Sequence, residues 1–189
     1  MTKLTIMRGV SGSGKSTWAD SQFGATVVSR DRLRVALFGS DGVDYYQSPN
    51  LRAREDLITE VEHAAIRTGL AAGNHVISDN TNIEPKYMKS IVKIAHDADA
   101  EVEVQVVDIT LNEALTRNAE RALGGGRNVP DSTIKKQFER FRQTRNWVPP
   151  LRPALPKPYN GTPGKPKAFM VDLDGTLAHR TCPVHQSMV

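Results

Sequence analysis

Gly9-Val10-Ser11-Gly12-Ser13-Gly14-Lys15-Ser16 matches the pattern G-x-x-x-x-G-K-[ST]. The glycines let the backbone fold into a ring of N–H donors around a phosphate, and the following helix points its positive end at the same anion. In this pattern the lysine reaches the β- and γ-phosphates and the Ser hydroxyl ligates Mg²⁺. We therefore expect ATP, or another nucleoside triphosphate, and Mg²⁺ as cofactors. The binding residues would be Gly9, Gly12, Ser13, Gly14, Lys15, Ser16 and Thr17, with Ser16 on the metal.

The segments around this loop alternate between strand and helix patterns. The expected strands are 3–8, 25–29, 75–78 and 102–109, and the expected helices are 16–22, 32–38, 51–70, about three turns from Pro85, 112–123 and 132–146. Residues 39–50, which hold two glycines and Pro49, are expected to be a loop. This alternation predicts an α/β fold with a mostly parallel sheet flanked by helices. Ligands then bind beyond the carboxyl ends of the strands.

Composition excludes several other classes of protein. The 189 residues are 39% apolar and 24% charged, with a net charge of +4, the balance of a globular protein rather than a disordered one. No apolar run approaches the roughly 18 residues of a membrane helix, and no secretory signal is evident. The single cysteine, Cys182, cannot form an internal disulfide. We expect a cytoplasmic protein with no membrane partner.

The expected second strand ends at Arg30-Asp31, with Arg34 one helical turn later. A carboxylate beside a γ-phosphate can take the proton from an acceptor hydroxyl, and the arginine can hold a second phosphate. The same spacing also fits a helix cap by Asp31 with a salt bridge to Arg34. The residues alone leave these two interpretations open.

The expected third strand ends at Asp79-Asn80-Thr81-Asn82. Asp79 can help to place Mg²⁺ or its waters, and the three residues after it can bind an acceptor. The alternative is an Asx turn that leads to the helix at Pro85.

A helical lid is expected after the fourth strand. Arg117 and Arg121 share one helix face, and the three glycines 124–126 would form its hinge. Such a helix can bring arginines over the transferring phosphate. Residues 113–145 hold eight basic and four acidic side chains, which suits a polyanion but is also compatible with a solvated helix face. The eight are Arg117, Arg121, Arg127, Lys135, Lys136, Arg140, Arg142 and Arg145.

These motifs together resemble the 5′-polynucleotide kinases of the phage kinase–phosphatase type. The matching segments are 9–18, Arg-Asp-x-x-Arg at 30–34, Asp-x-Thr-Asn at 79–82, Arg-Asn-x-x-Arg at 117–121, Val-Pro at 129–130 and the linker 159–167. The resemblance extends through Leu177. Because catalysis does not dictate the linker sequence, its match indicates shared descent.

The resemblance implies the fold of a P-loop kinase with a helical lid, and a role for each matched residue. Lys15 and Ser16 would hold the donor phosphates and the metal, and Asp31 would be the general base for the 5′-hydroxyl. Arg34 would bind the phosphate next to that hydroxyl. Arg121, with Arg117, would stabilise the transferring phosphoryl group from the lid. Asp79 and Thr81 would shape the acceptor pocket, although one family pattern has the Asp directly before Thr-Asn, where this chain has Asn80.

The chain is expected to divide into three parts. Residues 1–148 would be the kinase domain, 149–167 a proline-rich linker, and 168–189 the truncated start of a haloacid-dehalogenase-type phosphatase domain. Asp172 and Asp174 resemble that domain's first motif, but its later motifs are absent, so no phosphatase activity is expected. The spacing of His179, Cys182 and His185 lacks an evident fourth ligand, so no metal site is expected there.

The main hypothesis is ATP-dependent phosphorylation of the 5′-hydroxyl end of DNA or RNA in nucleic-acid repair. A nucleic-acid ligase is a candidate functional partner, and host cytoplasm is the expected location if a phage encodes the chain. The alternatives are a P-loop kinase for a small metabolite and a nucleotide-gated, non-catalytic nucleic-acid-binding module. The sequence leaves open whether the chain forms a homo-oligomer.

Overall fold

The computed structural model describes residues 2–154, and one compact unit spans Met1–Arg152. The strands are β1 (Lys3–Arg8), β2 (Thr26–Val28), β3 (His75–Ser78) and β4 (Glu101–Val106). The helices are α1 (Lys15–Ser21), α2 (Arg30–Phe38), α3 (Val43–Tyr46), α4 (Leu51–Ala71), α5 (Pro85–Asp97), α6 (Leu111–Leu123) and α7 (Asp131–Thr144). The expected phosphatase segment, linker residues 155–167 and the His179–His185 cluster lie outside the described residues.

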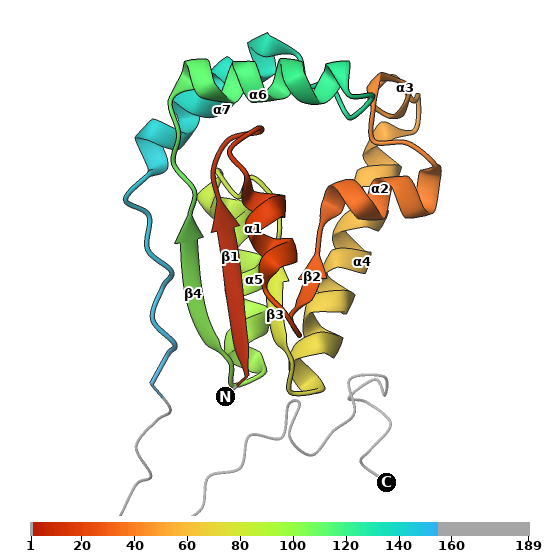
Figure 1. Cartoon of the computed structure of the whole chain (residues 1–189). Helices are drawn as coiled ribbons and strands as arrows, with labels where there is room; N and C mark the ends of the chain where they lie inside the picture. Colours follow the sequence, from red (N-terminus) through yellow and green to blue (C-terminus); the bar gives the residue numbers. More distant parts are fainter. Residues whose placement is uncertain (1, 155–189) are drawn as a thin grey trace, which may run out of the picture. The chain divides into compact units, whose positions relative to one another are not determined.

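All strand pairs in the sheet are parallel, and the strand order is β2-β3-β1-β4. The register runs from Lys3 opposite His75 and Glu101 to Arg8 opposite Val106. The expected α/β architecture is therefore confirmed. Figure 1 shows α6 and α7 lying beyond the carboxyl ends of the strands, where the phosphate-binding loop also lies.

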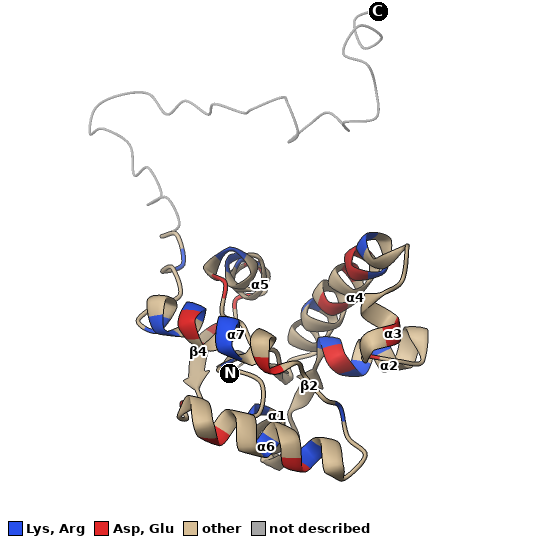
Figure 2. Ribbon diagram, turned by 90° about the horizontal axis from the view of Figure 1, so that it is seen from above, with Lys and Arg blue, Asp and Glu red and all other residues tan. Residues whose placement is uncertain are grey.

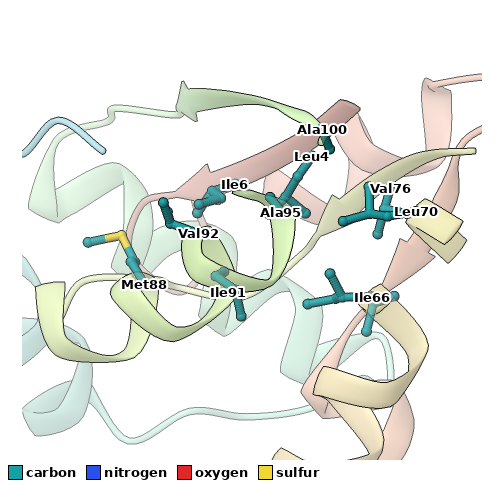
Figure 3. Close-up of a cluster of buried hydrophobic side chains, with 11 residues drawn as sticks. Leu4, Ile6, Ile66, Leu70, Val76, Met88, Ile91, Val92, Ala95 and Ala100 are labelled. Carbon is teal, nitrogen blue, oxygen red and sulfur yellow. The ribbon is translucent and has the colours of Figure 1, made fainter. Parts of the chain in front are cut away.

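Alternating side chains of β1 are buried on opposite faces of the sheet. Leu4 and Ile6 pack with Ile66 of α4 and with Met88 and Val92 of α5. Figure 3 shows this cluster between the sheet and the two helices. Met7 belongs to a second cluster, on the face covered by α1. Because β1 is buried on both faces, its carboxyl end is a fixed base for the loop that follows.

A third apolar cluster holds the lid in place. It joins Val10 of the loop after β1 to Ala114 of α6 and to Ile134 and Phe141 of α7. The apolar side chains of Ile134 and Phe141 thus face inward. The lid packs directly on the phosphate-binding loop.

Two details of the fold differ from the expectations. A short helix, α3, lies within the expected loop 39–50. The fourth strand ends at Val106 rather than Ile109, because the chain leaves the sheet after the amide of Val107 donates to the carbonyl oxygen of Arg8. No helix among the described residues is long and apolar enough to span a membrane.

Candidate active site

The phosphate-binding loop connects β1 to α1. Gly14 precedes the helix with a φ of 97°, and Lys15 is its first residue. Lys15 Nζ donates to the carbonyl oxygen of Val10 at 2.7 Å and to Ser13 Oγ at 3.3 Å. Burial lowers the pKa of Lys15 to about 8, although the charges of Asp79 and Asp31 oppose the shift. A nearby phosphate would supply the negative charge that this buried ammonium lacks.

Gly12 brings the loop against the lid. Its φ is 82°, and a Cβ atom there would lie 2.7 Å from the carbonyl oxygen of Ala114 in α6. A side chain at this position would therefore push the loop and α6 apart. The glycine spacing of the motif serves this close packing as well as phosphate binding.

Ser16 and Asp79 place oxygen ligands beside Lys15. Asp79 follows β3, its amide donates to the carbonyl oxygen of Val28 at 2.9 Å, and its side chain is buried. Burial raises the pKa of Asp79, while a hydrogen bond from Ser16 and the charge of Lys15 oppose this. A hydroxyl and a carboxylate are the hard ligands that Mg²⁺ accepts, usually with phosphate oxygens and water completing its shell. This donor set fits Mg²⁺ bound together with a nucleotide.

A cavity of about 480 Å³ lies over this loop. Its lining includes most of the residues predicted to contact the phosphate donor: Gly12, Gly14, Lys15, Ser16, Thr17, Arg117 and Arg121. It also includes Asp31, Asp79, Asn80 and Thr81. Gly9 and Ser13 belong to the loop but do not line the cavity. Ser13 instead accepts from Lys15, and the Gly9 amide donates to the carbonyl oxygen of Thr81 at 3.2 Å.

Asp31 lies in the first turn of α2. One of the two open interpretations combined a helix cap by Asp31 with a salt bridge to Arg34. The cap is wrong, because the cap position is Ser29, whereas the salt bridge is present. The carboxylate instead pairs with two guanidinium groups. Arg34 Nη1 lies 2.6 Å from Asp31 Oδ1, and Arg127 pairs with Oδ2. The side chain of Asp31 is half exposed, so a substrate can approach it.

Arg34 is buried and is held by Glu55 of α4. Its Nε and Nη2 atoms donate to the two oxygens of Glu55 at 2.8 and 2.9 Å. Glu55 also accepts from Arg30 Nη2 at 2.8 Å and from the Tyr45 hydroxyl at 2.7 Å. Burial alone would raise the pKa of Glu55, but these donors lower it to about 2. Glu55 therefore stays ionised and fixes the direction of Arg34.

A second cavity, of about 910 Å³, extends from Asp31 and Arg34 between α4, α5 and α7. The residues that line both cavities are Ser11, Asp31, Asn80, Thr81 and Arg127. A ligand in the larger cavity would meet one in the smaller cavity at the carboxylate of Asp31. A reaction between two bound substrates requires their binding sites to be adjacent in this way.

Asn80 and Asn82 reach the larger cavity, but other contacts use their side chains. Asn80 Oδ1 accepts from the Arg30 amide at 2.9 Å, and Asn80 Nδ2 donates to Glu62 at 2.7 Å. Asn82 has a φ of 45° and donates to the carbonyl oxygen of Met7 at 2.9 Å. The side-chain amides of Asn80 and Asn82 thus form hydrogen bonds that connect the ends of neighbouring strands.

The two predicted lid arginines reach the smaller cavity. Arg117 donates to the carbonyl oxygen of Ser13 at 3.3 Å and pairs with Glu113. Arg121 donates to Asn118 Oδ1 at 2.8 Å. Burial and then the charge of Arg127 lower the pKa of Arg121. The lid therefore brings positive charge to the place where donor phosphates would lie.

Several residues at the site were not assigned a role from sequence. Arg127 entered only as one basic residue among eight, and Glu55 was not singled out.

Arg117, Arg127, Arg140, Arg142 and Arg145, five of the eight basic residues, pair with carboxylates. Figure 2 shows both signs of charge along α4, α6 and α7. Neighbouring carboxylates therefore offset much of the positive charge of this segment.

The chain is similar to several known proteins. A family model described as AAA domain matches residues 4–144. A protein of Autographa californica nuclear polyhedrosis virus, described as a candidate bifunctional polynucleotide kinase/RNA ligase, is 31% identical over 184 residues. That match covers 93% of this chain and 25% of the viral protein. An L-seryl-tRNA(Sec) kinase of Methanococcus maripaludis is 26% identical over 138 residues, 73% of this chain and 52% of that enzyme.

Among solved structures, a chain of the Pnkp1/Rnl/Hen1 RNA repair complex superposes with a TM-score of 0.67 and 28% identity. The match covers 83% of this chain and 50% of that chain. A second structure of that complex gives a TM-score of 0.52 and 29% identity over 61% of this chain and 38% of the other. This chain thus spans between a quarter and about half of the length of these relatives.

Proposed function

Because this chain belongs to the AAA domain family, with a phosphate-binding loop between β1 and α1, we propose that it is an ATP-dependent polynucleotide 5′-hydroxyl kinase. It would transfer the γ-phosphoryl group of ATP to the 5′-hydroxyl end of DNA or RNA. The relatives described as a polynucleotide kinase/RNA ligase and as part of an RNA repair complex support this acceptor class.

One observation carries the proposal: Asp31 lies in the wall shared by the two cavities. The smaller cavity contains the loop, Lys15 and Ser16, and would hold the triphosphate. The larger cavity contains Arg34, and would hold the acceptor end. A carboxylate between the two is where a general base must lie if it is to take a proton from an attacking hydroxyl.

The reaction follows from this placement. The 5′-oxygen attacks the γ-phosphorus and forms a new P–O bond, while Asp31 takes the hydroxyl proton. The bond between the γ-phosphorus and the β–γ bridging oxygen breaks, and ADP leaves. Lys15 and Arg121 offset the negative charge on the transferring group. Bound Mg²⁺, held by Ser16 with Asp79 nearby, would neutralise charge on the donor phosphates.

Arg34 would recognise the acceptor as a polynucleotide. Glu55 occupies its Nε and Nη2 atoms, and Nη1 points at Asp31. A guanidinium held in this way can bind the phosphate next to the 5′-hydroxyl, which a simple alcohol lacks. The acceptor would therefore need a phosphate next to the reacting hydroxyl.

The direct test uses γ-labelled ATP and a 5′-hydroxyl oligonucleotide, with a 5′-phosphorylated oligonucleotide as the control substrate. Label should enter only the 5′-hydroxyl strand. Asp31→Asn should lower kcat roughly 10²- to 10⁴-fold with little change in ATP affinity. Lys15→Ala should lose the transfer. Unchanged turnover in Asp31→Asn would remove this residue as the base.

The same assay separates the other candidate functions. Transfer to a small alcohol that is insensitive to oligonucleotide competitors would indicate a metabolite kinase. Transfer to a serine-charged tRNA in preference to an oligonucleotide would indicate the activity that the Methanococcus relative is named for. ATP binding without any transfer would indicate a non-catalytic module. If the main proposal holds, the 5′-phosphorylated product is a substrate that a nucleic-acid ligase can consume, in keeping with the ligase named in the viral relative.

A further inference from the structure

Arg127 connects the lid to the wall of the acceptor cavity. It comes directly after the three glycines 124–126 that follow α6, and its side chain extends from the lid to residues of α2 and α3. It pairs with Asp31, lies 3.4 Å from Asp41 Oδ2 and donates to the Tyr46 hydroxyl at 3.1 Å. The loop after α6 approaches α3 in Figure 1. These contacts join two parts of the fold that are far apart in the sequence.

The two arginines on Asp31 are supported very differently. Arg34 holds Oδ1 and is itself fixed by two hydrogen bonds to Glu55 within the packed pair of α2 and α4. Arg127 holds Oδ2 and is carried by a loop whose Gly125 has a φ of 77°. Glycine in this conformation allows the loop to change direction at low cost. Arg127 is therefore the partner of Asp31 that belongs to the lid, whereas Arg34 belongs to the fixed wall of the cavity.

The lid also contains two positive charges that repel each other. Burial lowers the pKa of Arg121, and the charge of Arg127 lowers it further. Both residues line the smaller cavity beside Lys15. Asp31 and Asp41 offset part of this positive charge. The ion pairs of Arg127 thus keep it in the wall of the smaller cavity together with Arg121, where a phosphoryl group would relieve their repulsion.

We propose that Arg127 is a positioning residue that docks the lid on the acceptor wall through Asp31 and Asp41. Docking would set the position of α6, and with it the placement of Arg117 and Arg121 over the donor phosphates. Closure of the lid would thereby be coupled to the carboxylate that receives the hydroxyl proton. The inference rests on the proposed function for the catalytic roles of Asp31 and Arg121. The docking contacts themselves do not depend on the acceptor.

The test compares Arg127→Ala and Arg127→Lys with Arg142→Ala as a matched control. Arg142 is an exposed lid arginine on α7 whose nearest carboxylate, that of Glu139, is 3.7 Å away. Arg127→Ala should lower kcat roughly 10- to 100-fold, with KM for ATP changing much less, because misplaced arginines act mainly on the transition state. Arg127→Lys should recover part of kcat, since an ammonium can pair with Asp31 but cannot keep all three contacts. Arg142→Ala should behave as wild type.

Amide hydrogen exchange provides the second readout. In Arg127→Ala the amides of residues 124–129 should exchange faster, because the loop loses its anchor. Asp41→Asn should produce a smaller change of the same kind, and its effect on kcat should not add to that of Arg127→Ala. Either an unchanged kcat in Arg127→Ala, or a lowered kcat with unchanged exchange of the loop, would overturn the proposal. If wild type phosphorylates no 5′-hydroxyl end, the proposed function fails, and the exchange comparison still decides the docking.

Discussion

Glu55 holds Arg34 by both carboxylate oxygens, at 2.8 and 2.9 Å, so a residue of α4 fixes the side chain that α2 presents to the larger cavity. Glu55 lies in the second helical turn of a 21-residue helix whose apolar face is buried against the sheet. The direction of Arg34 is therefore tied to the core of the fold. A guanidinium fixed in this way loses little freedom when it binds a phosphate.

We expect Glu55→Gln to lower stability at neutral pH by roughly 1–3 kcal/mol, because the buried donors of Arg34 lose a charged acceptor. The pKa of Glu55 is lowered to about 2 in the folded protein. A carboxylate with a lowered pKa stabilises the fold above its unfolded pKa of about 4.3 and ceases to do so as pH falls toward the folded value. The gap between wild type and Glu55→Gln should narrow over that range in urea unfolding. Glu60→Gln, an exposed position on the same helix, is the control, and an equal effect from it would contradict the prediction.

Much of the fold follows from short-range signals in the sequence. The loop motif, the valine-rich strands and Pro85 at the start of a helix are local features, and the structure places β1 and β3 at the expected residues. The small helix α3 was missed because a four-residue helix between glycine- and proline-containing segments has too few positions to show a period.

The site was less accessible from sequence because its key contacts are not local. Arg127 meets Asp31 only after the sheet and the lid have brought α2 and the α6–α7 loop together. Glu55 is an ordinary acidic residue on a helix until Arg30 and Arg34 fold onto it. Asp31 fitted both a cap with a salt bridge to Arg34 and a catalytic base. The observed cap at Ser29 excludes the cap, whereas the salt bridge is present. A motif predicts what a residue type can do, whereas its partners are set by tertiary packing.

Arg8, at the end of β1, should be the most sensitive charged residue for stability. It is fully buried, and its guanidinium donates to the carbonyl oxygens of Asn82, Thr144 and Arg145. The last two lie at the negative end of α7. Arg8→Lys should cost roughly 1–3 kcal/mol, since an ammonium cannot reach both groups of carbonyls and leaves buried acceptors unpaired. Thermal unfolding measures this, and the exposed Arg52→Lys on α4 should leave the midpoint unchanged.

Gly12→Ala should weaken ATP binding more than its backbone conformation alone explains. Gly12 and Gly24 have φ values of 82° and 79°, so an alanine is strained by a similar amount at either position, about 1–2 kcal/mol. At Gly12 the new Cβ would also lie 2.7 Å from the carbonyl oxygen of Ala114, whereas at Gly24 nothing lies within 4 Å. Both variants should lose stability, and only Gly12→Ala should lose ATP affinity in calorimetry. Equal ATP affinity in the two variants would show that contact with α6 does not shape the loop.

The lowered pKa of Lys15 predicts that nucleotide binding is coupled to proton uptake. Burial brings the pKa of Lys15 to about 8, so above that pH the amine is largely neutral. Phosphates bound beside Lys15 favour its charged form and raise its pKa, so ATP must draw a proton onto the amine at higher pH. ATP affinity should therefore fall as pH rises through about 8, with proton uptake measured by calorimetry in two buffers of different ionisation enthalpy. Lys15→Arg, whose guanidinium stays charged, should bind ATP without this uptake. Equal binding heats in both buffers at a pH of about 9 would contradict the assignment of the buried ammonium to the phosphate site.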